Sequence, residues 1–233
     1  TALYSLRDHV SREAEKFETI FEVTGETTMQ ANERLCAGDE KVVCLNFASA
    51  KNPGGGFLNG SKAQEECLSR SSGLYPCLAL RSMMYTVNRK FDSCLYTDNM
   101  IYSPSVPFFK NDDGDLLDNY YTCSVLTVPA VNAGVVIQQE PQNIESIEPT
   151  MLARTEKLLS IALVQGYKTI VLGAWGCGVF RNKPEMVAAH FHYHLCDNPI
   201  FKGAFKKVVF AVLDFSEEQS MILPFKEKFK PSH

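Results

Sequence analysis

The sequence predicts an α/β fold in which helices cover both faces of a β-sheet. Apolar runs of strand length alternate along the chain with segments of helical periodicity. The runs at residues 41–47 and 168–172 are almost continuously apolar, which is typical of strands buried on both faces. The 233 residues suffice for one substantial core and contain no internal repeat or clear linker, so we expect a single domain over residues 1–233.

Turn residues set the boundaries of the remaining predicted elements. An N-terminal helical extension is expected at residues 4–18, and residues 110–115 predict an exposed turn. Further strands are expected at residues 19–23, 100–103, 123–128 and 208–213. Further helices are expected at residues 29–36 (capped by Thr27 or Thr28), 62–71, 75–85, 149–165 and 184–196, with a last helix after the final strand.

Composition excludes several classes of protein. A net charge of −4 has the wrong sign for generic nucleic-acid binding through a basic face. No apolar run approaches the roughly 18 residues of a membrane helix, and the N-terminal segment lacks the apolar stretch of a secretory signal. The eight cysteines show no C-x-x-C spacing, so we expect a reducing compartment, cytoplasmic or nuclear. A translocated effector and a leader removed before Thr1 stay open as alternatives.

Two glycine-rich loops follow predicted strands, where open α/β sheets place their ligands. The first glycine loop (residues 48–60) contains three successive glycines, Gly54, Gly55 and Gly56, whose amides can converge on an anion or a sugar. The alternative is a flexible surface turn. The second glycine loop (residues 173–180) ends just before a predicted helix, whose positive end would help to hold a diphosphate. The alternative there is close strand–helix packing.

Large or reactive side chains in the second glycine loop have their own interpretations. Trp175 and Phe180 are too large for a simple turn and are candidates to form a wall of a ribose-binding site. Cys177 lies near a helix N-terminus but has no histidine or carboxylate partner close in sequence, which argues against a nucleophile. His190 and His194 have the one-turn spacing of zinc ligands, yet no third ligand is evident and an ordinary amphipathic helix is favoured. We therefore expect no metal.

Two consecutive glutamates, Glu65 and Glu66, follow the first glycine loop at the start of a helix. Neighbouring helix residues point about 100° apart, so one carboxyl group can reach a reacting bond while the other orients sugar hydroxyls. A carboxyl group against an apolar wall has a raised pKa and can protonate a departing oxygen, as glycosidic cleavage requires. The alternative is a pair of solvated surface glutamates beside the positive end of the helix.

These segments together resemble one family, the poly(ADP-ribose) glycohydrolase-like macrodomains in their compact microbial form. The resemblance runs through nearly the whole chain, and the Gly-Gly-Gly and Gln-Glu-Glu pairing is its most specific part. The matching segments are residues 46–50 (NFASA), 52–56 (NPGGG), 64–66 (QEE), 71–75 (SSGLY), 101–104 (IYSP), 129–134 (PAVNAG), 173–180 (GAWGCGVF) and 210–214 (FAVLD).

The resemblance implies a mixed sheet between helical layers and an ADP-ribose cleft across its crest, with no cofactor. Glu66 would be the general acid and base, and Glu65 would bind the neighbouring ribose. Phe215 would stack on adenine, and Glu26 is a weaker candidate for the adenine amine. Lack of the large enzymes' accessory domain favours attack at chain ends. The implied substrate-binding residues are Asn52, Gly54, Gly55, Gly56, Gln64, Asn132, Gly173, Ala174, Gly176, Cys177, Gly178, Val179, Phe180 and Phe215.

The expected function is hydrolysis of ribose–ribose bonds in poly(ADP-ribose). One alternative keeps the site but removes single ADP-ribose units from a protein side chain such as arginine. Another is a non-catalytic reader of ADP-ribose, against which the presence of both Glu65 and Glu66 argues. Nucleotide-dependent oxidoreduction is disfavoured because no G-x-G-x-x-G follows the first strand. The expected partner is ADP-ribose or ADP-ribosylated protein, without a membrane.

Overall fold

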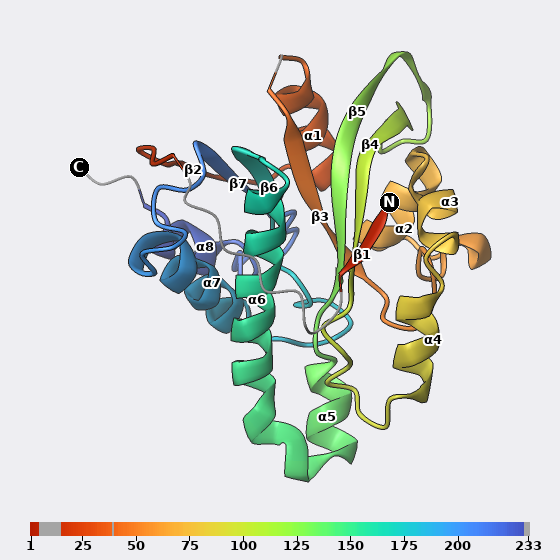
Figure 1. The fold of residues 1–233 in the computed structure, drawn as a ribbon, viewed down its shortest axis with the longest axis vertical. Coiled ribbons are helices and arrows are strands. Elements are labelled where there is room, and N and C mark those ends of the chain that lie inside the picture. Colours follow the sequence, from red (N-terminus) through yellow and green to blue (C-terminus); the bar gives the residue numbers. More distant parts are fainter. Residues whose placement is uncertain (5–14, 39, 231–233) are drawn as a thin grey trace.

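A mixed β-sheet runs through the middle of the molecule between two layers of helices (Figure 1). The computed structural model describes residues 1–4, 15–38 and 40–230. Within them the strand order is β1-β4-β5-β3-β6-β7-β2, parallel from β5 through β2 and antiparallel across β1, β4 and β5. The strands are β1 (Ala2–Tyr4), β2 (Ile20–Thr24), β3 (Val42–Ala48), β4 (Met100–Lys110), β5 (Leu116–Pro129), β6 (Thr169–Leu172) and β7 (Lys207–Ala211).

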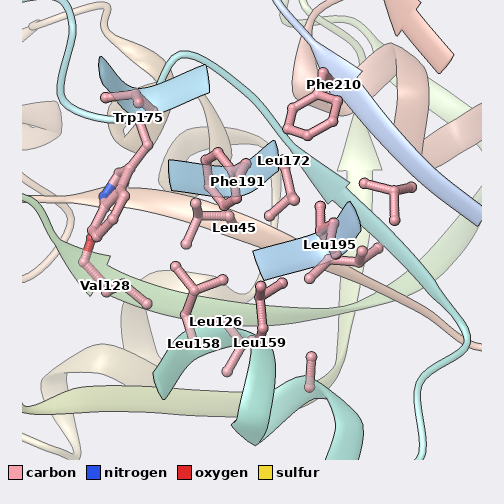
Figure 2. Close-up of a cluster of buried hydrophobic side chains, with 14 of the residues drawn as sticks. Leu45, Leu126, Val128, Leu158, Leu159, Leu172, Trp175, Phe191, Leu195 and Phe210 are labelled. Carbon is pink, nitrogen blue, oxygen red and sulfur yellow. The ribbon is translucent and has the colours of Figure 1, made fainter. Parts of the chain in front are cut away.

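Each face of the sheet has its own apolar cluster and its own helices. One face packs against α1 (Thr28–Cys36), α2 (Gln64–Ser71), α3 (Leu74–Ala79) and α4 (Met83–Lys90). The other packs against α5 (Ala133–Gln139), α6 (Ile147–Val164), α7 (Pro184–His192) and α8 (Leu223–Lys228). Figure 2 shows the second cluster, where leucines of β3, β5 and β6 meet Leu158 and Leu159 of α6 and Phe191 of α7. This is the three-layer α/β/α arrangement that the sequence predicts.

The alternation of side chains along β3 determines what each face receives. Val43 and Leu45 point into the cluster of α6 and α7, whereas Val42 and Cys44 point into the cluster of α1 to α4. Asn46 continues the second series and therefore lies under α2, the helix that carries the glutamate pair. The period of two residues thus places a polar side chain of the central strand directly behind the candidate site.

Several predicted elements differ from the observed ones. The helical extension at 4–18 lies largely outside the described residues, but Tyr4 belongs to β1 and residues 15–19 are not helical. The pattern at 75–85 forms two helices, because the chain tightens at Leu80 and Arg81, whose amides bond Pro76 and Leu78 carbonyls. β4 and β5 extend beyond their predicted ends to form a long hairpin. A bulge between Ser103 and Val106 lets β4 continue past Pro104.

The remaining predicted elements agree with the structure more closely. Thr27 caps α1, with a reciprocal capping box that includes Gln30. The helix that begins at Pro184 ends as a π-turn over Tyr193–Asp197. α5 was not among the predicted helices, since Gly134 lies inside it, and its start is fixed by the Asn132 side chain accepting from the Val135 amide.

Candidate active site

Both glycine loops lie at the same edge of the sheet. β3 runs parallel to β6 and pairs with it directly, so the carboxyl ends of the two strands lie side by side. The first glycine loop leads from β3 towards α2, through a 3-10 turn at Phe57–Asn59. The second leads from β6 towards α7. Segments that are distant in the sequence therefore form the two sides of one place in the fold.

A cleft of two adjoining cavities separates the glycine loops. The cavities have volumes of about 330 Å³ and 240 Å³ and share Phe47, Ala63, Gln64, Ala174 and Gly178 as lining residues. The larger continues towards α1 and the segment after β7. The smaller contains the glutamate pair and ends at Phe180. A continuous cleft of this size, with one polar end, suits a ligand as long as a dinucleotide.

Glu66 is held inside the smaller cavity. Its residue is only 9% exposed, and its Oε1 accepts a 2.9 Å hydrogen bond from the Gly56 amide. Gly54 and Gly55 both adopt left-handed backbone conformations, with φ of +67° and +61°. A Cβ on Gly55 would overlap Glu66 Oε1 and lie 2.9 Å from Glu66 Cδ. The glycines are therefore needed for the carboxyl group to occupy this position.

Glu65 points beneath the loop towards β3 and is 3% exposed. Its Oε1 accepts a 3.2 Å hydrogen bond from Asn46 Nδ2, and its Oε2 accepts a 2.6 Å bond from the Ser49 amide. Burial raises the pKa of Glu65 to about 8, the Glu66 carboxyl contributes to the rise, and the Ser49 and Asn46 hydrogen bonds oppose it. The structure thus excludes a pair of solvated surface glutamates.

Gln64 fixes the start of α2 against β3. Its Oε1 accepts a 2.9 Å hydrogen bond from the Phe47 amide, and its Nε2 donates to the Leu45 carbonyl at 2.7 Å and to Thr28 Oγ1 at 3.1 Å. Ala63, the residue before the helix, provides no side-chain cap. The side-chain amide of Gln64 therefore sets the position of the two glutamates that follow it. Gln64 also lines both cavities.

The second glycine loop is both closely packed and open to the cleft. A Cβ on Gly173 would lie 2.6 Å from the Ala211 carbonyl, and one on Gly176 would lie 2.5 Å from Ala130 Cβ, so these glycines do serve packing. In the part of the chain that the structure describes, however, the amides of Gly176, Gly178, Val179 and Phe180 donate no hydrogen bond. Four unpaired N–H groups beside a cleft can donate hydrogen bonds to an anion.

Trp175 does not wall the cleft, contrary to the prediction from its size. It is 0% exposed, its ring lies in the core shown in Figure 2, and its Nε1 donates a 3.0 Å hydrogen bond to the Val128 carbonyl. A buried indole with a satisfied N–H anchors the second glycine loop to β5. Phe180 is partly exposed and does line the smaller cavity.

The other reactive side chains considered above, those of Cys177, His190 and His194, are not arranged as a nucleophile or as a metal site. Cys177 is 5% exposed, and burial raises its pKa to about 12, so its thiol carries no charge at neutral pH. His194 contacts the Leu152 carbonyl, and His190 lies 3.7 Å from the Glu148 carboxylate. Over the described residues, no three His, Cys, Asp or Glu side chains are grouped to hold a metal ion.

Of the remaining predicted residues, Glu26 lines a cavity, whereas Asn52, Asn132 and Phe215 line neither. Asn52 is exposed on the first glycine loop, with its amide bonded to Ser49 Oγ at 3.1 Å. Glu26 lines the larger cavity, where both its oxygens accept from Arg34. Asn132 caps α5 beside the second glycine loop and lines neither cavity. Phe215 is 89% exposed on the segment after β7.

That segment is shaped by Asp214. Its carboxylate accepts from the Ser216 amide and hydroxyl and from the Met221 and Ile222 amides. These hydrogen bonds, that of the Ser216 hydroxyl first, lower the pKa of Asp214 to about 2. The turn keeps the Phe215 ring outside the core. Leu213 and Met221, on either side of this turn, line the larger cavity.

Sequence reasoning did not identify Asn46 and Ser49 as individual site residues. Asn46 is 0% exposed and also donates to Thr127 Oγ1 at 3.2 Å, so it ties Glu65 to both central strands. The sequence does contain a signal for Asn46, because it is the one polar residue after Lys41 in the apolar run 41–47. A polar side chain in a strand buried on both faces needs a hydrogen-bond partner, and one partner of Asn46 is the Glu65 carboxyl group of the site.

Comparisons with known proteins agree with this geometry. Residues 1–111 match the family model of the microbial-type PARG catalytic domain. The crystal structure of poly(ADP-ribose) glycohydrolase from Thermomonospora curvata is 41% identical, with a TM-score of 0.91 over 98% of this chain and 85% of that one. The enzyme from Deinococcus radiodurans in complex with ADP-ribose is 43% identical, with a TM-score of 0.86 over 93% and 86%. No match was found among the curated proteins.

A further structure, the Thermomonospora curvata enzyme bound to the inhibitor ADP-HPD, is 44% identical with a TM-score of 0.86 over 91% of this chain and 80% of that one. The three-layer fold and the buried glutamate pair between two glycine loops define the class: a macrodomain-like glycohydrolase. At this identity over most of each chain, the family is also shown. The chain belongs to the poly(ADP-ribose) glycohydrolase (PARG) family. Among the described helices, none has the length and apolarity to cross a membrane.

Proposed function

We propose that the protein hydrolyses the ribose–ribose bond at the terminal unit of poly(ADP-ribose), with Glu66 as general acid and base. The observation that supports this most directly is the Glu66 carboxyl, which is 9% exposed in the cleft and held by the Gly56 amide. Glu66 lines the smaller cavity and not the larger one, so a reacting sugar would approach it there, between the two glycine loops. The carboxyl group of a solvated glutamate would not be held in a fixed orientation towards one glycosidic bond.

In the first step, protonated Glu66 donates its proton to the oxygen that leaves the anomeric carbon of the terminal ribose. The carbon–oxygen bond breaks, and positive charge develops on the ring as an oxocarbenium-like state. The Glu66 carboxylate produced here lies beside that charge. The Gly56 amide stabilises the carboxylate through the 2.9 Å hydrogen bond, so the site is already arranged for the product of proton transfer.

In the second step, the Glu66 carboxylate takes a proton from water while the water oxygen bonds the anomeric carbon. Free ADP-ribose forms, the shortened chain keeps the leaving oxygen as a hydroxyl, and Glu66 is again protonated. One residue therefore supplies and recovers the same proton. No metal or cofactor enters the proposed cycle.

Glu65 would bind the hydroxyls of the adjacent ribose. Because burial raises its pKa to about 8, Glu65 is largely protonated at neutral pH and can both donate and accept hydrogen bonds. A neutral Glu65 also leaves the pair with a single negative charge during the reaction. Asn46 and the Ser49 amide fix the carboxyl group from behind, so its orientation does not depend on the substrate.

The rest of ADP-ribose would follow the cleft away from the glutamates. The unpaired amides of Gly176, Gly178, Val179 and Phe180 would hold the diphosphate. The larger cavity would receive the adenosine, with Glu26 near the adenine amine and the Phe215 ring stacked on the base. Asn52 and the three glycines would contact the terminal ribose at the other end.

A paired release assay tests the function. The protein is incubated with poly(ADP-ribosyl)ated protein and, in parallel, with arginine-linked and serine-linked mono-ADP-ribosylated protein, and free ADP-ribose is measured. We expect release from the polymer only. Release from the arginine-linked substrate alone would favour the mono-ADP-ribosyl alternative, and ADP-ribose binding without release from any substrate would favour a reader.

A further inference from the structure

Tyr96 occupies an unusual position in the loop between α4 and β4. It is 8% exposed and has a left-handed backbone conformation with φ of +58°, which non-glycine residues rarely adopt. The fully buried Arg154 of α6 holds this conformation: its Nη2 donates to the Leu95 carbonyl at 3.0 Å and to the Tyr96 carbonyl at 3.3 Å. Residues with strained backbone conformations cluster at functional sites.

The Tyr96 side chain contacts both sides of the cleft. Its ring centroid lies 6.1 Å from that of Phe180, at the end of the second glycine loop. The Lys51 ammonium of the first glycine loop lies over the same ring, 5.8 Å from its centroid. One side chain from a third segment thus bridges the two loops at the end of the cleft where Glu66 and Phe180 lie.

Phe180 is partly exposed and packs against the edge of the apolar cluster that contains α5 to α8. Its carbonyl accepts a 3.0 Å hydrogen bond from the Gly134 amide, which fixes the backbone, and the Tyr96 ring provides an aromatic contact to its side chain. The neighbouring Val179 is 83% exposed, although it also lines the smaller cavity. Asn132, which caps the helix containing Gly134, also lies beside the Tyr96 hydroxyl. Tyr96 therefore supports Phe180 through its ring and contacts the segment that holds the Phe180 backbone.

We infer that Tyr96 is a positioning residue for the reaction: its ring sets the distance between Phe180 and the first glycine loop, and so the width of the terminal-ribose site. This inference rests on the proposed function. Tyr96 lines neither cavity, so it acts on substrate through Phe180, which lines the smaller cavity, rather than by contact. A ribose held too loosely would turn its anomeric carbon away from Glu66.

A purely structural role is the competing interpretation, and the chain offers a matched control. Tyr102 of β4 is also 8% exposed, and its ring also lies 6.1 Å from another aromatic ring, that of Tyr167. It lines neither cavity. Loss of the ring from Tyr96 and from Tyr102 should lower thermal stability to a similar degree, while only the Tyr96 change should alter the cleft.

The experiment compares Tyr96→Leu, Tyr102→Leu and Tyr96→Phe with the wild-type protein. Calorimetry gives the Kd for ADP-ribose, and release from polymer gives kcat and KM. For Tyr96→Leu we expect a Kd raised about tenfold and a kcat/KM lowered roughly 100-fold, the order expected for a small misplacement of substrate. Tyr96→Phe, which keeps the ring, should stay within about twofold of wild type, and Tyr102→Leu should bind and turn over normally.

Tyr96→Gly provides a second variant, since glycine adopts φ of +58° without strain and isolates loss of the ring. It should behave as Tyr96→Leu does. Normal Kd and kcat/KM in Tyr96→Leu or Tyr96→Gly would overturn the inference, as would an equal loss in Tyr96→Phe or in Tyr102→Leu. A wild-type protein that binds ADP-ribose but releases none would contradict the proposed function alone, because the Kd comparison would still decide the role of Tyr96. A wild-type protein that neither binds nor releases ADP-ribose would overturn both.

Discussion

Gly55 lies directly against the Glu66 carboxyl group, and any side chain at residue 55 would occupy the space of Glu66 Oε1. The same glycine has φ of +61°, so residue 55 requires glycine for two separate reasons: its backbone conformation and its close approach to Glu66. A positive φ favours glycine in any left-handed turn. The close approach to Glu66 favours glycine only if catalysis requires the carboxyl group at this position. The two reasons can be tested separately.

Gly55→Ala should therefore reduce activity by about 100-fold or more, because the new methyl group displaces the Glu66 carboxyl from its position. Gly60→Ala is the matched control: Gly60 has φ of +84° in the same loop, and a Cβ there would have no atom within 4 Å. Both variants should lose roughly 1 kcal/mol of stability from backbone strain. Equal activities of the two variants would show that the Gly55–Glu66 contact has no catalytic importance.

The stability of the protein should depend on the ionisation of Glu65. Its pKa rises from an ordinary value of 4.5 to about 8 on folding, so the native state holds a proton that the unfolded chain releases between these values. This contribution to stability is complete below about pH 4.5 and is lost as the pH rises through about 8. Glu65→Gln, which is neutral at every pH, should lack it.

Thermal unfolding between pH 4.5 and 8.5 measures this effect. The Tm of wild type minus that of Glu65→Gln should fall as the pH rises, and the exposed control Glu145→Gln should follow wild type. A difference that stays constant over the range would mean that Glu65 is ionised in the folded protein.

Phe215→Ala tests where the adenine binds. The ring is 89% exposed, so its removal should leave the Tm almost unchanged, while loss of stacking should raise the Kd for ADP-ribose about tenfold. The affinity for ribose 5-phosphate, which has no base, should not change. Tyr120→Ala, which removes a ring that is 68% exposed on β5, provides the surface control. Loss of affinity for both ligands would place Phe215 elsewhere than at the adenine.

Phe180→Ala tests the opposite end of the cleft. Removal of this ring should raise the Kd for ADP-ribose about tenfold, because the terminal ribose loses an apolar wall. Phe91→Ala, a change at a partly exposed phenylalanine after α4, should not affect binding. Calorimetry on both variants gives the comparison, and unchanged affinity in Phe180→Ala would remove Phe180 from the site.

The part of the site that could be predicted from the sequence is the part encoded locally. The three glycines and the Gln-Glu-Glu run are separated by only seven residues, so a turn followed by a helix start brings them together in almost any packing. The parallel strands ahead of the two glycine loops were equally visible as apolar runs. Hence the cleft and the glutamate pair could be predicted before any coordinates.

What the sequence could not show depends on contacts between distant segments. Trp175 is in the same loop as Phe180, yet its ring is buried in the core, where its Nε1 donates to the Val128 carbonyl of β5. Tyr96 carries no local signal, since its backbone is set by Arg154 of α6. β4 likewise continues past Pro104 through a bulge that only its pairing with β5 reveals.

The catalytic role of Glu66 is tested most directly by release of ADP-ribose from poly(ADP-ribose) by Glu66→Gln, with binding of ADP-ribose measured on the same protein. Glu148→Gln is the control, a glutamate also in the first turn of a helix but with a side chain that is 74% exposed. We predict that Glu66→Gln retains ADP-ribose binding and loses at least about 1,000-fold in turnover, since it can neither donate nor accept the proton. Turnover equal to wild type in Glu66→Gln would contradict the account.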